Sequence, residues 1–142
     1  MRNLMVAILL TAVLSGVEAF GGTRGTPDDM SQFANEIAAN LVYRPDANIL
    51  VRARNCQLHI EYGSLHVAFD LPLKETTLYE NETEDSIILS NSKMTRTLKG
   101  KAPEPYERVV LRFERRTVKS MLKTFENAVT TCGGGKTVAG IK

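Results

Sequence analysis

The residues with the clearest chemical potential lie in one short stretch of the sequence, which contains the chain's two histidines, His59 and His66. If residues 63–64 form a two-residue hairpin turn, Glu61 lies opposite His66, and His59 and Asp70 share the same polar face of the two strands. Directly opposed Cβ atoms in an antiparallel pair are about 5 Å apart. Imidazole and carboxylate groups at that spacing can bind a divalent metal ion or act as an acid–base pair. The alternative is an ordinary solvated sheet face on which two histidines coincide by chance.

The other patterns that usually accompany catalysis are missing from the sequence. It contains no G-x-S-x-G nucleophile motif and no H-E-x-x-H zinc motif, and no cysteine and histidine have the spacing of a nucleophile and its base. Gly135-Lys136-Thr137 matches only the end of a phosphate-binding loop, because that motif needs a glycine where this chain has Thr130. These absences favour a protein without catalytic activity, and the sequence indicates no cofactor.

Residues 1–19 have the features of a secretory signal peptide. Arg2 precedes an apolar run over 4–14, and Val17-Glu18-Ala19 supplies the small residues that a signal peptidase recognises. The run is shorter than the ~20 residues that a membrane-spanning helix needs, and a retained N-terminal anchor is the alternative. We therefore expect an exported protein, with the periplasm favoured and the extracellular medium as the alternative. Its mature chain would start with a flexible leader over 20–26.

Export determines how the two cysteines, Cys56 and Cys132, are interpreted. In an oxidising compartment an even number of cysteines indicates a disulfide, and two cysteines allow a single pairing. Metal binding by this pair is the weaker interpretation because neither residue belongs to a C-x-x-C motif. We expect a structural disulfide, which for so long a loop would stabilise the fold by about 4–5 kcal/mol in the chain-entropy model.

The charged residues balance over the whole chain but are unevenly distributed along it. Eighteen basic and sixteen acidic residues give a net charge of +2, which excludes a strongly basic binder of polyanions. Residues 75–85 are acidic, whereas residues 93–123 contain ten basic and three acidic side chains. Arg116, Lys119 and Lys123 would form a stripe on one helix face, which is a candidate contact for an anionic partner. Nucleic acid is not expected, because no aromatic side chains alternate with the stripe. The alternatives are an ordinary solvated face or a complement to the acidic segment.

Two helices are predicted, one near each end of the mature chain. The first spans 27–42 and has Thr26 as its N-cap. The second has apolar residues at steps of three and four from Val118 to Cys132, and the glycines at 133–135 end it. Because Cys132 belongs to the buried stripe, the disulfide would join this helix to the sheet.

Between the helices, apolar and polar side chains alternate as they do in half-buried strands. A phase change near 54–55 divides the first run, 49–62, by a bulge or into two strands. A return strand follows the hairpin turn, and further strands are predicted over 76–80, 86–90, 94–98 and 107–114. The fold class is α+β: an N-terminal helix, an antiparallel meander of four to six strands and a C-terminal helix packed on one sheet face. This single domain would cover 27–133, with a flexible tail over 134–142.

Two functions of different classes are compatible with these features. The first is a small, disulfide-stabilised, exported binding module whose partner is another envelope or secreted protein or an anionic surface. The second is a metal-binding or metal-dependent hydrolytic protein that uses His59, Glu61 and His66, with Asp70 as a fourth group. A carrier of a lipid or small ligand would need a cavity between the helices and the sheet.

Overall fold

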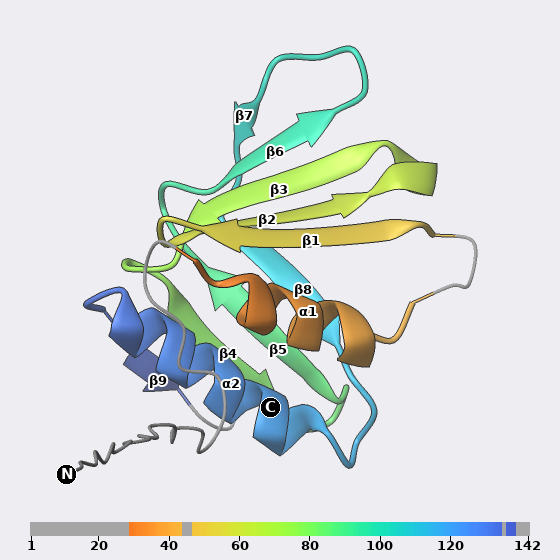
Figure 1. Ribbon diagram of the computed structural model, residues 1–142. Helices are drawn as coiled ribbons and strands as arrows, with labels where there is room; N and C mark the ends of the chain where they lie inside the picture. Colours follow the sequence, from red (N-terminus) through yellow and green to blue (C-terminus); the bar gives the residue numbers. More distant parts are fainter. Residues whose placement is uncertain (1–28, 44–46, 135, 139–142) are drawn as a thin grey trace, which may run out of the picture.

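The computed structural model describes residues 29–43, 47–134 and 136–138, and these form two helices and nine strands (Figure 1). The helices are α1 (Ser31–Asn40) and α2 (Val118–Thr131). The strands are β1 (Ile49–Arg54), β2 (Gln57–Tyr62), β3 (Val67–Pro72), β4 (Thr77–Asn81), β5 (Ser86–Ser90), β6 (Thr95–Leu98), β7 (Glu104–Pro105), β8 (Arg108–Arg112) and β9 (Lys136–Val138). The predicted signal peptide, the leader and the Thr26 cap lie outside the described residues.

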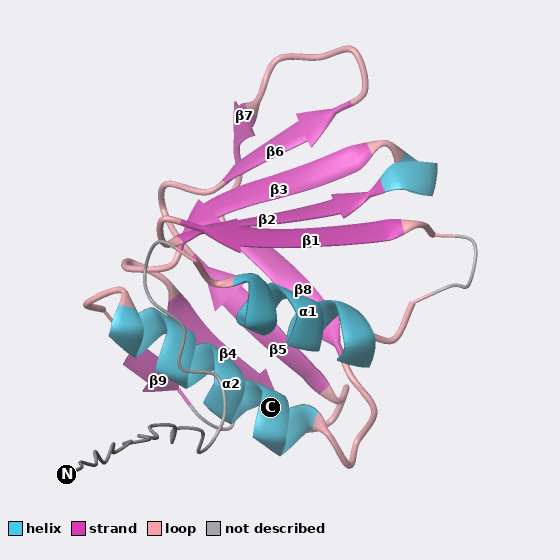
Figure 2. Ribbon diagram, in the orientation of Figure 1, coloured by secondary structure: helices cyan, strands magenta, loops and turns pink. Residues whose placement is uncertain are grey.

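The strands form two sheets instead of one continuous meander (Figure 2). The larger sheet has the order β1-β2-β3-β6-β7, and all of its pairs are antiparallel. The smaller sheet has the order β8-β5-β4-β9, in which only β9 is parallel to its neighbour. The chain passes from one sheet to the other after β3, β5 and β7. The α+β class and the two flanking helices are therefore confirmed, whereas the single meander is replaced by two sheets.

Helix α1 packs against β1 and begins later than the sequence predicts. It starts at Ser31 instead of residue 27, and its N-cap residue, Met30, makes no side-chain hydrogen bond, so the contact comes from Asp29, one residue earlier. The Ser31 amide donates to Asp29 Oδ1 over 3.1 Å, which satisfies one of the amides that a helix start leaves unpaired. Its buried side consists of Phe33, Ala34 and Ile37.

Helix α2 packs on β4 and β5 of the smaller sheet. Its predicted apolar stripe is buried and consists of Val118, Met121, Leu122, Phe125, Ala128 and Val129. At its C-terminus the amides of Gly133 and Gly134 donate to the carbonyls of Thr130 and Val129 over 2.9 and 3.1 Å. This is a Schellman motif, and the φ of 82° at Gly133 is the left-handed conformation that the motif requires. The predicted glycine stop is thus confirmed.

After α2 the chain returns to the smaller sheet. A Cβ atom at Gly134 would collide with the backbone carbonyl of Lys74, so this close approach requires glycine. Strand β9 then pairs with β4, although it lies in the segment for which the sequence predicts a flexible tail, 134–142. Three residues are too few for an alternating pattern to reveal a strand.

One hydrophobic core connects both helices with both sheets. Leu58 of the larger sheet and Leu89 of the smaller sheet are fully buried and belong to the same apolar cluster. Phe125 of α2 packs edge-to-face on Phe33 of α1, with 5.3 Å between the ring centroids. Both helices and both sheets therefore belong to one packed unit.

Candidate functional site

The β2–β3 hairpin carries the predicted histidine site, but its register differs from the prediction. Glu61 lies opposite Ala68 instead of His66. The strands are joined by the four residues 63–66, which include a 3-10 turn, and not by a two-residue turn. His66 is the last residue of this loop and has a left-handed φ of 54°. The predicted pairing of Glu61 with His66 is therefore wrong.

The actual register brings His59, and not His66, to the carboxylates. His59 lies opposite Asp70, and its Nδ1 is 2.7 Å from Asp70 Oδ1. Its Nε2 is 3.5 Å from Oε2 of Glu61 on the same strand. On the other side of β2, Arg52 of β1 is the register partner of His59. The polar face of the larger sheet thus carries a row of charged groups, in which both ring nitrogens of His59 face carboxylate oxygens.

The predicted metal site is assembled only in part. His59, Glu61 and Asp70 meet, whereas His66 lies apart in the hairpin loop. In residues 29–43, 47–134 and 136–138, no three histidine, cysteine or carboxylate side chains are grouped in a way that could hold a metal ion. The contacts of His59 orient its imidazole on the polar face of the larger sheet.

Cys56 and Cys132 form the predicted disulfide. Asn55 and Cys56 make the turn between β1 and β2, and their φ angles of 51° and 58° are both positive, as a type I′ turn requires. The phase change predicted near 54–55 therefore separates two strands and is not a bulge. Because Cys132 directly follows α2, the disulfide joins the tip of the β1–β2 hairpin to the end of that helix.

The basic stripe predicted on the last helix is partly neutralised by nearby carboxylates. Lys119 Nζ lies 3.2 Å from Glu80 Oε1 and 3.7 Å from Glu82 Oε1. The hydrogen bond to Glu80 is the main reason why the pKa of Lys119 is raised above its usual value. Arg116 pairs with Glu114 over 2.8 Å. Two of the three predicted stripe residues therefore already have an anionic neighbour.

The acidic and basic segments pair with each other inside the molecule. Each acidic side chain of 75–85 has a basic partner: Glu75 with Lys93, Glu84 with Arg112, Asp85 with Arg115, and Glu80 and Glu82 with Lys119. Lys123 is exposed and forms no ion pair with another described residue. The internal pairing reduces the charge that Arg116, Lys119 and Lys123 offer to an anionic partner.

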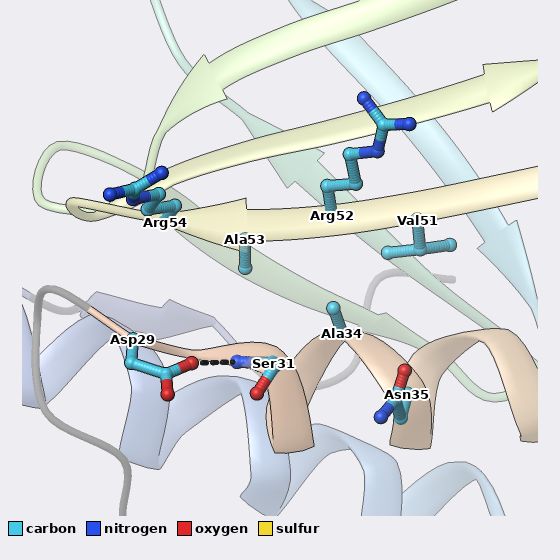
Figure 3. Close-up of a pocket in the computed structure, with 8 residues that line it drawn as sticks. All are labelled: Asp29, Ser31, Ala34, Asn35, Val51, Arg52, Ala53 and Arg54. Carbon is cyan, nitrogen blue, oxygen red and sulfur yellow. Dashed lines mark hydrogen bonds between the residues drawn. The ribbon is translucent and has the colours of Figure 1, made fainter.

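A groove that the sequence does not predict lies between the N-terminal half of α1 and β1 (Figure 3). It has a volume of about 640 Å³, and its walls include Ser31, Ala34 and Asn35 from the helix and residues 51–54 from the strand. Val51 and Ala53 point towards the helix, whereas Arg52 points away from it. The strand wall thus alternates between small apolar side chains on the inner side and arginines on the outer side.

The charged groups at this groove differ in their partners. Asp29 is bound to the amide of Ser31, and this hydrogen bond is the main cause of its lowered pKa, with a smaller contribution from Arg54. Arg52 and Arg54 are exposed, and neither makes an ion pair with another side chain in the described part of the chain. The alternation of Val51 and Ala53 with arginines is visible in the sequence, but alternation does not tell which strand lies at a sheet edge.

No protein-family model matches the chain, and no curated protein or solved structure matches it either. Within the described residues, neither helix is long and apolar enough to cross a membrane.

Proposed function

We propose that the protein is an exported, disulfide-stabilised binding module without catalytic activity. The observation that carries this proposal is the groove between α1 and β1, which is large enough for a peptide or a small ligand. The described lining of the groove contains no histidine, cysteine or lysine, and its one carboxylate, Asp29, is bound to the amide of Ser31, so the Ser31 hydroxyl has no histidine or lysine beside it to act as a base. The Cys56–Cys132 disulfide supports export, because such bonds persist in oxidising compartments.

The test is capture of a partner by the mature, oxidised protein. The protein is immobilised with its disulfide intact, exposed to the periplasmic and secreted fractions of its source cells, and the retained proteins are identified by mass spectrometry. We expect a defined protein to be retained at physiological salt and to be competed off by the free mature protein. Retention of nothing, or only of proteins that a salt wash removes, would contradict the proposal.

A metal-binding protein is the second candidate, and the contacts of His59 with Asp70 and Glu61 are the observation that favours it. Zinc, copper and nickel are titrated into the metal-free protein and into a His59→Ala, His66→Ala double variant. A binding module without metal should show no uptake and no change in melting temperature in either protein. Stoichiometric uptake by the wild type that the double variant loses would favour the second candidate.

A further inference from the structure

We infer that the groove binds an extended, acidic segment of a partner protein, which adds to the larger sheet as a strand beside β1. This inference rests on the proposed function and specifies its partner. Strand addition of this kind takes its affinity from backbone hydrogen bonds and its specificity from alternate side chains. The backbone, the space and the charge at β1 each support it.

The backbone of β1 offers an open row of donors and acceptors. In the described part of the chain β1 has β2 as its one strand neighbour. The two-residue turn makes Arg54 and Gln57 a hydrogen-bonded pair, and such pairs alternate with non-bonded ones along an antiparallel ladder. The amides and carbonyls of Val51 and Ala53 therefore point away from β2 and towards the groove that these residues line.

The other sheet edges are short or partly covered. Strand β7 has two residues, one of them Pro105, which lacks an amide donor. At the edge of β8, the Val42 amide donates to the Arg112 carbonyl over 2.9 Å, and Leu41 bridges to Phe113. Strand β9 has three residues. Among the described strands, β1 thus presents the longest open edge, with six residues.

The groove leaves room for a chain at the distance of a neighbouring strand. An added strand would lie about 4.8 Å from β1, above the N-terminal half of α1. The helix presents Ser31 and Ala34 on this wall, and the strand presents Ala53. Because these side chains are small, the inner side chains of an added strand can be accommodated if they are small and apolar.

The charges on β1 select the outer side chains of the added strand. Arg52 and Arg54 are two residues apart, so they lie on the same face, and each would be next to a side chain of the added strand. Acidic side chains at alternate positions would therefore match this edge. A second copy of the chain that paired through its own β1 would bring arginines beside arginines, which is unfavourable. The charge pattern thus indicates a different, acidic partner.

The test uses capped peptides of alternating valine and glutamate, with alternating valine and lysine as the charge control. Binding of fluorescently labelled peptide to the oxidised mature protein is measured by anisotropy. We expect the glutamate peptide to bind and the lysine peptide not to bind. Reversing both arginines, Arg52→Glu with Arg54→Glu, should weaken binding of the glutamate peptide by at least about tenfold. Arg108→Glu, a reversal at an exposed arginine of β8, should leave binding unchanged.

Two further experiments test the backbone and the groove. One series of peptides is N-methylated at the valine amides and a second series at the glutamate amides. Only one of these two sets of amides faces β1, so N-methylation should abolish binding in one series. Binding that neither modification changes would overturn the inference. Asn35→Trp, which fills the groove, should abolish binding, whereas Gln32→Trp on another exposed position of α1 should not.

The outcome separates this inference from the proposed function. If the protein retains a partner from the periplasmic or secreted fraction equally well with and without Arg52→Glu and Arg54→Glu, the module binds elsewhere and only the strand-addition inference falls. If the oxidised wild type retains no partner, the proposed function falls. Loss of the partner in the arginine double variant, but not in Arg108→Glu, would support both.

Discussion

At the residue scale, Cys56 occupies a backbone position that does not suit its type. It is the second residue of a type I′ turn and has a φ of 58°, where glycine is the usual residue. A left-handed conformation costs a residue with a Cβ about 1–2 kcal/mol. Asn55, at the first turn position, tolerates the same conformation better. Only the bond to Cys132 gives a reason for cysteine here, so the disulfide takes precedence over the turn preference.

This conflict predicts an order of stability among variants that lack the disulfide. Cys56→Gly combined with Cys132→Ser should be more stable than Cys56→Ser combined with Cys132→Ser, by about 1 kcal/mol, because glycine removes the conformational cost. Urea denaturation of both double variants measures the difference in free energy of unfolding. Equal stability, or a less stable glycine variant, would contradict the strained turn.

At the element scale, an ion pair links α2 to the smaller sheet. Glu80 of β4 lies on the same face of its strand as the buried Leu78, and it is 5% exposed. Its carboxylate receives a hydrogen bond from Lys119, whose own side chain is 78% exposed. A buried carboxylate that loses its partner is unfavourable, whereas an exposed lysine alone is not.

Lys119→Ala should therefore lower the free energy of unfolding more than Lys123→Ala does. Lys123 lies on the same helix and has no ion pair among the described residues.

The stabilisation by Lys119 depends on pH in a defined direction. The pKa of Lys119 is raised above its ordinary value of 10.5, chiefly by the hydrogen bond to Glu80, so its stabilisation is complete below pH 10.5 and is lost as pH rises through the folded-state pKa. Thermal melts across the alkaline range should show the gap between wild type and Lys119→Ala closing above pH 10.5. A gap that persists there would contradict the role of the charge.

The helices and strands themselves could largely be predicted from the sequence, but the pairing of the strands into sheets and its register could not. The strands over 77–81, 86–90 and 95–98 lie within a residue or so of their predicted spans, because alternation identifies a half-buried strand. The β2–β3 register shifted by two residues from the prediction, and such a shift keeps every side chain on its face. The hydrophobic pattern therefore cannot distinguish the two registers, and only the length of the turn determines which one forms. For the same reason the pattern could reveal neither the second sheet nor the open edge of β1.

At the scale of the whole molecule, the disulfide connects a hairpin of the larger sheet to the helix that packs on the smaller sheet. Cys56 lies at the tip of the β1–β2 hairpin of the larger sheet, and Cys132 follows the helix that packs on the smaller sheet. The two residues are 76 positions apart. Reduction should therefore lower the free energy of unfolding by about 4–5 kcal/mol, because the unfolded chain regains the freedom of a long loop. Urea denaturation with and without reductant measures this, and a loss below about 1 kcal/mol would contradict the clamp.

The two sheets form one cooperative unit. The chain crosses between the sheets after β3, β5 and β7, and one apolar cluster contains side chains from both sheets, so the sheets should unfold together. Leu58→Ala, at a fully buried site of the larger sheet, should cost about 2–5 kcal/mol. Amide hydrogen exchange should then accelerate in β4, β5 and β8 of the smaller sheet as much as in β1, β2 and β3. Leu65→Ala, at a hairpin-loop side chain that is 63% exposed, is the matched control and should change neither sheet. Acceleration confined to the larger sheet would mean that the two sheets are separate folding units, and that the clamp between Cys56 and Cys132 joins two bodies instead of reinforcing one.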